Sequence, residues 1–188
     1  MTFQYDLRFL EAGLDNLESY LLSNDLYWPP GIQANYGEAP YPSLTPGSIL
    51  LAKKRAEIQV KESIDKSRLD NCLYRWDQIT SQWKVAWNKK SELDFQARLR
   101  LWRDFLDDLR EKPEAHYDRY RYEITRRVQL QLLQTQQIQL EAEEIKMLSI
   151  LDRRLRTILK PGIFIWEADL VTGFPPDEFW YLYGNIQE

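Results

Sequence analysis

The chain has 188 residues, a formal net charge of −4 and one cysteine, Cys72. This charge argues against general binding to polyanions or acidic membranes, and a single cysteine excludes an intrachain disulfide. No apolar run is long enough for a membrane helix, and the first residues do not resemble a secretory signal, so we expect a cytoplasmic protein.

The first predicted element is a helix over residues 1–25. Its apolar residues repeat with alternating spacings of four and three: Phe3, Leu7, Leu10, Leu14, Leu17 and Leu21. Such spacing is typical of the a and d positions of a heptad repeat, which form the contact between two packed helices. We therefore expect this helix to pack against another helix.

Residues 26–45 are predicted to be an ordered linker, because prolines and glycines alternate there with aromatic residues. Thr45 followed by Pro46 predicts the start of the next helix. Threonine is a preferred N-cap, and proline is favoured in the first helical position, where its missing N–H has no helical partner.

The stretch from Ser48 to Lys160 contains no glycine and a single proline, Pro113. Proline cannot donate the helical hydrogen bond and disfavours helix in the residue before it, so Pro113 predicts a corner. We expect a long antiparallel, coiled-coil-like hairpin over residues 46–160, whose second arm alone would extend about 70 Å. A break near Asn88–Ser91, where Ser91 resembles an N-cap, is the alternative to a continuous first arm.

Two apolar stripes run along the end of the first arm. The stripe that contains Leu93, Ala97, Leu101 and Phe105 is expected to face the second arm. The other stripe contains Phe95, Leu99, Trp102, Leu106 and Leu109. It needs a different neighbour, which could be the first helix or a second copy of the chain.

Residues 161–188 are predicted to form a small aromatic cap together with the linker. Prolines and aromatic residues dominate this segment, and we expect a short extended piece followed by one final helix. The cap should cover the start of the hairpin, near Ile49 and Ile58. Tryptophan and tyrosine are common at binding hot spots, so the cap is also an expected docking place.

The sequence predicts an all-α, non-enzymatic module for protein–protein interaction or assembly. It would self-associate or bind a protein partner through the first helix, the second stripe and the cap. No catalytic residue, metal site, cofactor, membrane contact or small-molecule substrate is predicted, and Cys72 is expected to be a core residue. The predicted partner-binding residues are Trp28, Tyr41, Phe95, Leu99, Trp102, Leu106, Trp166, Phe179 and Trp180.

Nucleic-acid binding is the alternative function. Arginine pairs with phosphate and tyrosine stacks on bases, and both residue types gather after Pro113. The facing acidic block between Asp104 and Glu111 would neutralise much of this surface, so we expect protein binding instead. The alternative nucleic-acid residues are Arg119, Arg121, Tyr122, Arg126 and Arg127.

Overall fold

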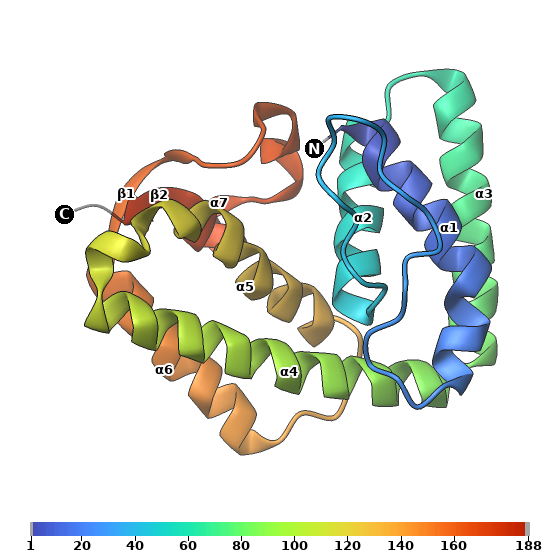
Figure 1. Ribbon diagram of the computed structural model, residues 1–188. Helices are drawn as coiled ribbons and strands as arrows, with labels where there is room; N and C mark the ends of the chain where they lie inside the picture. Colours follow the sequence, from blue (N-terminus) through green and yellow to red (C-terminus); the bar gives the residue numbers. More distant parts are fainter. Residues whose placement is uncertain (1, 187–188) are drawn as a thin grey trace.

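The structure is a computed structural model that describes residues 2–186, and it is mostly helical (Figure 1). Its longer helices are α1 (Phe3–Leu22), α2 (Pro46–Gln59), α3 (Ser63–Gln82), α4 (Lys84–Glu111), α5 (Tyr120–Gln134) and α6 (Ala142–Ile158). Near the C-terminus, β1 (Leu159–Phe164) and β2 (Tyr183–Ile186) pair as an antiparallel two-stranded sheet. The mostly helical class agrees with the sequence prediction. Within residues 2–186, no helix combines the length and the apolar character needed to cross a membrane.

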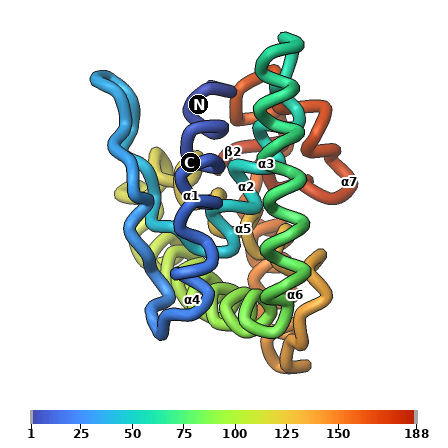
Figure 2. The backbone as a smooth tube through the Cα atoms, turned by 90° about the vertical axis from the view of Figure 1, so that its right-hand side faces the viewer, coloured from blue at the N-terminus to red at the C-terminus, as the bar shows by residue number. Residues whose placement is uncertain are grey.

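Helix α1 packs against α2 and also contacts α3, which runs alongside it (Figure 2). The heptad leucines of α1 are buried: Leu7, Leu10, Leu14, Leu17 and Leu21. Gly13 permits the close approach of α2, because a Cβ at this position would lie 3.0 Å from the Cδ1 of Ile49. The helical partner that the heptad spacing required is therefore supplied by the same chain.

The linker between α1 and α2 is ordered and lies along α1 (Figure 1). Trp28 and Leu44 pair through their backbones, with N–H···O distances of 3.2 and 2.8 Å. Arg8 of α1 forms a 2.6 Å ion pair with Glu38 of the linker. The backbone pairing joins the two ends of the linker to each other, and the ion pair holds its middle against α1.

Thr45 begins α2, as its sequence context predicted. Its Oγ1 accepts a hydrogen bond from the Ser48 N–H at 3.2 Å, and the Ser48 Oγ accepts one from the Thr45 N–H at 2.9 Å. The same Oγ1 accepts a 2.6 Å hydrogen bond from Nη2 of Arg98 on α4. One buried hydroxyl therefore caps α2 and connects it to α4.

We expect Thr45→Ala to lower the free energy of unfolding by about 1–2 kcal/mol, as the loss of a good N-cap does. The reason is that the Ser48 N–H and one Arg98 N–H lose their acceptor. Thr45→Ser keeps the hydroxyl and should lose much less. Urea denaturation of the three proteins measures the difference, and equal stability of the alanine variant would contradict the proposed role of the cap.

The predicted hairpin of two uninterrupted helices is wrong. The first arm divides after α2, at Val60–Glu62, and again at Trp83, where α3 gives way to α4. Trp76 and Trp87 meet edge to face across this second break, with ring centroids 4.8 Å apart. A straight helix would hold these residues about 16 Å apart along its axis. The alternative break at Asn88–Ser91 does not occur, because α4 is continuous there.

The second arm is also divided, since residues 135–141 separate α5 from α6. The corner at Pro113 is present: α4 ends at Glu111, and α5 returns antiparallel along α4 after two short 3-10 turns (Figure 1). The facing stripe differs from the expected one. Of the expected stripe, Ala97 and Phe105 are buried, but Leu93 and Leu101 are exposed by 41% and 42%. The stripe that contains Trp102 is buried throughout. Folding the arms into shorter helices lets several neighbours share one core, which two straight rods cannot do.

The C-terminal segment packs against α2 and α5, where it buries residues such as Trp166 and Phe174. Between the two strands lie the 3-10 helix η3 (Ala168–Gly173), the short helix α7 (Pro176–Phe179) and the 3-10 helix η4 (Trp180–Leu182). The expected final helix is thus replaced by a single helical turn and a strand. The segment covers Ile58 as predicted, and Gly173 comes so close that a Cβ would lie 1.9 Å from the Ile58 Cδ1. The linker does not join it, because the two segments lie on opposite sides of the molecule (Figure 2).

Candidate functional site

Most of the predicted partner-binding residues belong to the core. The buried ones are Phe95, Leu99, Trp102, Leu106, Trp166 and Phe179, and the half-buried ones are Trp28, Tyr41 and Trp180. Trp28 and Tyr41 contact α1 through Tyr20 and Tyr5, with ring centroids 6.4 and 4.4 Å apart. Partner binding through these residues stays a prediction, and the buried ones present little surface to a partner.

The five alternative nucleic-acid residues do not form one surface. Arg127 is buried, its guanidinium makes a two-point ion pair with Asp152 at 2.7 and 2.8 Å, and it lies over the Tyr181 ring. Arg119 and Arg126 both pair with the buried carboxylate of Glu123. These three arginines therefore already have anionic partners within the chain.

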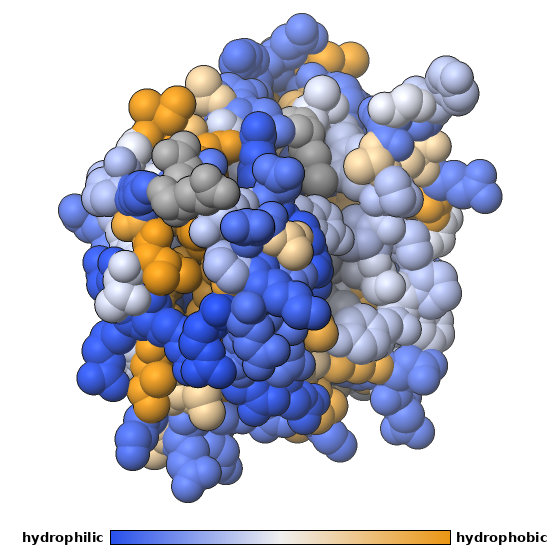
Figure 3. All heavy atoms as spheres, turned by 60° about the vertical axis from the view of Figure 1, so that its left-hand side comes forward, coloured by the Kyte–Doolittle hydropathy of each residue, from blue (hydrophilic) through white to orange (hydrophobic). Residues whose placement is uncertain are grey.

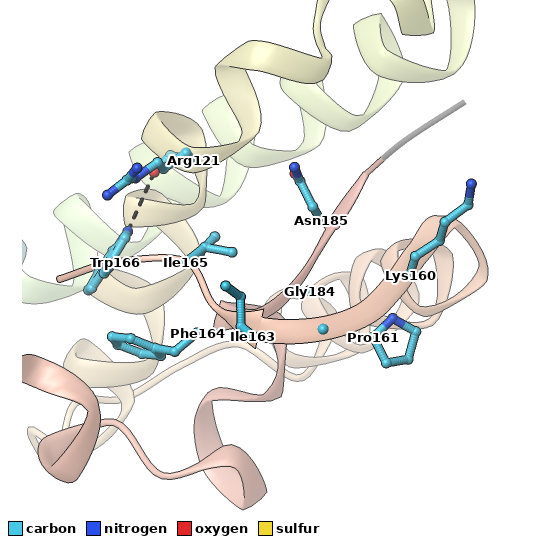
Figure 4. A pocket seen from close by; sticks show the side chains of 10 residues that line it. Arg121, Lys160, Pro161, Ile163, Phe164, Ile165, Trp166, Gly184 and Asn185 are labelled. Carbon is cyan, nitrogen blue, oxygen red and sulfur yellow. Dashed lines mark hydrogen bonds between the residues drawn. The ribbon is translucent and has the colours of Figure 1, made fainter. Parts of the chain in front are cut away.

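Arg121 and Tyr122 are exposed but line different cavities. Arg121 lies beside an open groove of about 520 Å³ over β1. Figure 4 shows Ile163 and Ile165 of this groove between Arg121 and Asn185, and a hydrogen bond from the Trp166 indole N–H to the Arg121 carbonyl. On the face that includes this end of the molecule, hydrophobic side chains form separate patches among hydrophilic ones (Figure 3). The groove is formed largely by one strand and its immediate partner, and so gathers few functional groups.

A second cavity, which we call the arginine cleft, gathers side chains from five parts of the chain and has a volume of about 380 Å³. It lies where α1, the linker, α2, α4 and α5 meet. Its lining residues are Tyr5, Asp6 and Phe9 of α1; Ala39, Pro40, Tyr41 and Pro42 of the linker; Ser48, Leu51, Ala52 and Arg55 of α2; Arg98 of α4; and Tyr122, Thr125, Arg126 and Gln129 of α5.

One side of the arginine cleft is aromatic. The Tyr41 ring stacks on Tyr5 and on Phe9, with centroids 4.4 and 5.6 Å apart. The Tyr5 hydroxyl donates a 3.1 Å hydrogen bond to the Pro40 carbonyl, which fixes the linker above α1. Burial raises the pKa of Tyr5 to about 12, so this hydroxyl keeps its proton at neutral pH. The resulting wall is rigid and apolar, with few rotatable groups.

Arg98 and Arg126 form the positive end of the arginine cleft. Arg98 makes a 2.9 Å ion pair with the fully buried Asp94 and donates hydrogen bonds to Gln129 and Thr45. Burial lowers the pKa of Arg126, and the charges of nearby Arg119 and Arg98 act in the same direction. Each of these two arginines also has a carboxylate partner behind the cleft lining, Asp94 for Arg98 and Glu123 for Arg126, and Arg119 shares the Glu123 carboxylate.

Arg55 and Asp6 are the most deeply buried charged residues of the arginine cleft, with exposed fractions of 6% and 2%. Burial raises the pKa of Asp6 to about 7, although the positive charge of Arg55 opposes this shift. Burial also lowers the pKa of Arg55, against the charges of Asp6 and Glu167. Oδ2 of Asp6 accepts no hydrogen bond from any residue that the structure describes.

Sequence reasoning missed Asp6, Arg55 and Arg98 as site residues. Asp6 lies outside the heptad seam of α1, and Arg55 follows two lysines, so the local pattern indicated solvent-facing side chains for both. Arg98 lies in a segment rich in arginine. No spacing along the chain connects these three residues, because they come from three separate helices.

No family model, curated protein or solved structure matches this chain. Within the described part of the chain, no group of three or more histidine, cysteine, aspartate or glutamate side chains is arranged to hold a metal ion. Cys72 is buried, and burial raises the pKa of its thiol, which makes it a poor nucleophile. The arrangement that remains is an aromatic wall beside three arginines, which suits the binding of an anionic group attached to an apolar one.

Proposed function

We propose that this chain is a non-enzymatic protein-interaction module whose docking site is the arginine cleft. The ligand is a segment of a partner protein that carries an acidic side chain next to an apolar or aromatic one. The observation that carries the proposal is the charge of the cleft lining: Arg55, Arg98 and Arg126 face a cavity where Asp6 is the one carboxylate among the described lining residues.

The local charge of the cleft contrasts with that of the whole chain. The protein has a net charge of −4, yet the residues that line the cleft include three arginines and one aspartate; the carboxylates of Asp94 and Glu123, which pair with Arg98 and Arg126, lie outside the lining. An arginine–carboxylate pair is stronger in a partly enclosed cavity than at an open surface, because water screens it less. The negative remainder of the surface disfavours long polyanions. A short acidic segment therefore fits better than a nucleic acid.

The aromatic wall supports a peptide ligand. Tyr5, Phe9 and Tyr41 present ring surface that is already held in place by stacking. Rigid aromatic side chains in a partly enclosed pocket are typical of binding hot spots, because little conformational entropy is lost when a partner binds. The linker residues Pro40 and Pro42 complete this wall without adding flexible groups.

The proposed partner is a different protein and not a second copy of the chain. The sequence predicts self-association because the α1 seam and the stripe that contains Trp102 both need apolar neighbours. Both sets of residues are covered by helices of their own chain. An interface between two copies would need another extended apolar surface, and single exposed residues such as Val85 do not provide one.

We expect Arg126→Gln to weaken binding of an acidic peptide about tenfold, since it removes a charge-assisted hydrogen bond. The peptide would be obtained by selection of a displayed random-peptide library on the wild-type protein. Arg121→Gln is the matched control, because Arg121 lies on the same helix but outside the cleft. Fluorescence anisotropy gives the affinities. Enriched peptides without acidic residues, or equal binding by the Arg126 variant, would overturn the proposal.

A further inference from the structure

We propose, resting on the proposed function, that Asp6 forms a second subsite of the arginine cleft, which accepts a hydrogen bond from a neutral N–H or O–H group of the partner segment. Asp6 is 2% exposed and its Oδ2 has no hydrogen-bond donor among the described residues. Buried carboxylate oxygens are normally paired, because an unpaired one has lost water without a replacement. A ligand that donates to Oδ2 supplies the missing partner.

The neighbours of Asp6 do not fill this role themselves. The Tyr5 hydroxyl is already engaged with the Pro40 carbonyl. The charges of Arg55 on α2 and of the N-terminal amino group both lower the pKa of Asp6, and the charge of Glu167, which precedes η3, raises it. Arg55 does not donate to Oδ2. Asp6 lines the cavity, and none of its described neighbours donates a hydrogen bond to its Oδ2.

A neutral donor fits this subsite better than a cation. Arg55 already places a positive charge beside Asp6, so an added ammonium group would be repelled by it. The backbone N–H of a peptide is neutral and donates one hydrogen bond. The cleft thus selects a segment whose acidic side chain meets Arg98 and Arg126 while a backbone N–H meets Asp6.

The two subsites respond differently to pH. Burial raises the pKa of Asp6 to about 7, whereas Tyr5, with a pKa of about 12, keeps its proton in the same range. Arg55 keeps its charge, as guanidinium groups do at these pH values. Glu167 has a lowered pKa and stays ionised. A hydrogen bond to an ionised carboxylate is stronger than one to its protonated form. Affinity should therefore rise as Asp6 loses its proton between pH 6 and pH 8.

The test uses the full chain and the strongest selected peptide that contains no histidine. We expect wild-type affinity to rise several-fold from pH 6 to pH 8 and the affinity of Asp6→Asn to rise much less, because the variant lacks the titrating carboxyl. We also expect one N-methylated peptide, which lacks a single backbone N–H, to bind the wild type about tenfold more weakly at pH 8. The same N-methyl group should have a much smaller effect on Asp6→Asn.

The unbound proteins provide the folding control. The pKa of Asp6 is higher in the folded chain than in the unfolded chain, so protonation of Asp6 stabilises the fold, and the contribution of Asp6 to stability should fall as pH rises from 4 to 7. Asp6→Asn should lack this component of the pH dependence. Identical pH profiles and identical N-methyl effects in both proteins would overturn the Asp6 subsite alone. Equal binding of the selected peptide by the wild type and by Arg126→Gln would instead overturn the proposed function.

Discussion

Arg127→Gln should lower the free energy of unfolding by about 3 kcal/mol, which is the lower end of the effect of breaking a buried ion pair. The guanidinium of Arg127 makes a two-point ion pair with Asp152 of α6 and lies 4.6 Å from the centre of the Tyr181 ring. Its side chain is 5% exposed, whereas that of Asp152 is 21% exposed and keeps some contact with water. The substitution leaves the Asp152 carboxylate without its partner. It also removes the contacts that Arg127 of α5 makes with α6 and with Tyr181 of the C-terminal segment.

Arg121→Gln is the matched control for this prediction, because Arg121 lies on the same helix and is exposed. Its stability should equal that of the wild type within about 0.5 kcal/mol. Urea denaturation followed by circular dichroism measures both variants. If Arg127→Gln unfolds at the wild-type midpoint, the ion pair does not connect these elements, and Arg127 would again be available to an external anion.

Trp166→Ala should lower the free energy of unfolding by about 3–5 kcal/mol, the usual cost of removing a buried aromatic side chain. Trp166 is 8% exposed, meets Phe174 edge to face at 5.3 Å, and has the Arg55 guanidinium 4.5 Å from its ring centre. The substitution leaves a cavity between the C-terminal segment and α2. It also loosens Arg55, so peptide binding in the arginine cleft should weaken as well.

Trp180→Ala is the control for Trp166→Ala, because it removes a tryptophan of the same segment that is only half-buried. Trp180 is half-buried and has the Arg156 guanidinium over its ring at 3.7 Å, so its loss should cost about 1 kcal/mol. Thermal and chemical denaturation of both variants provide the comparison. Equal effects of the two substitutions would show that Trp166 does not hold the C-terminal segment against α2 in the way that the contacts indicate.

Several local features were predictable from the sequence because short-range rules control them. The start of α2 at Thr45–Pro46 follows from capping chemistry, and the corner at Pro113 follows from the sterics of proline. The buried face of α1 follows from the spacing of its leucines. The burial of Cys72 follows from its place on an apolar stripe of what is now α3. Each of these depends on residues within a few positions of one another.

The helix breaks and the arginine cleft depend on contacts between distant residues. The break at Trp83 carries no glycine or proline, and it permits the contact of Trp76 with Trp87 that a straight helix would prevent. Asp6, Arg55 and Arg98 meet only because α1, α2 and α4 pack around one cavity. Helical periodicity describes which side of a helix is apolar, but the free energy that bends an arm or buries a charge comes from neighbours far along the chain. The fold class was therefore visible in the pattern of residues, whereas the site was created by tertiary packing.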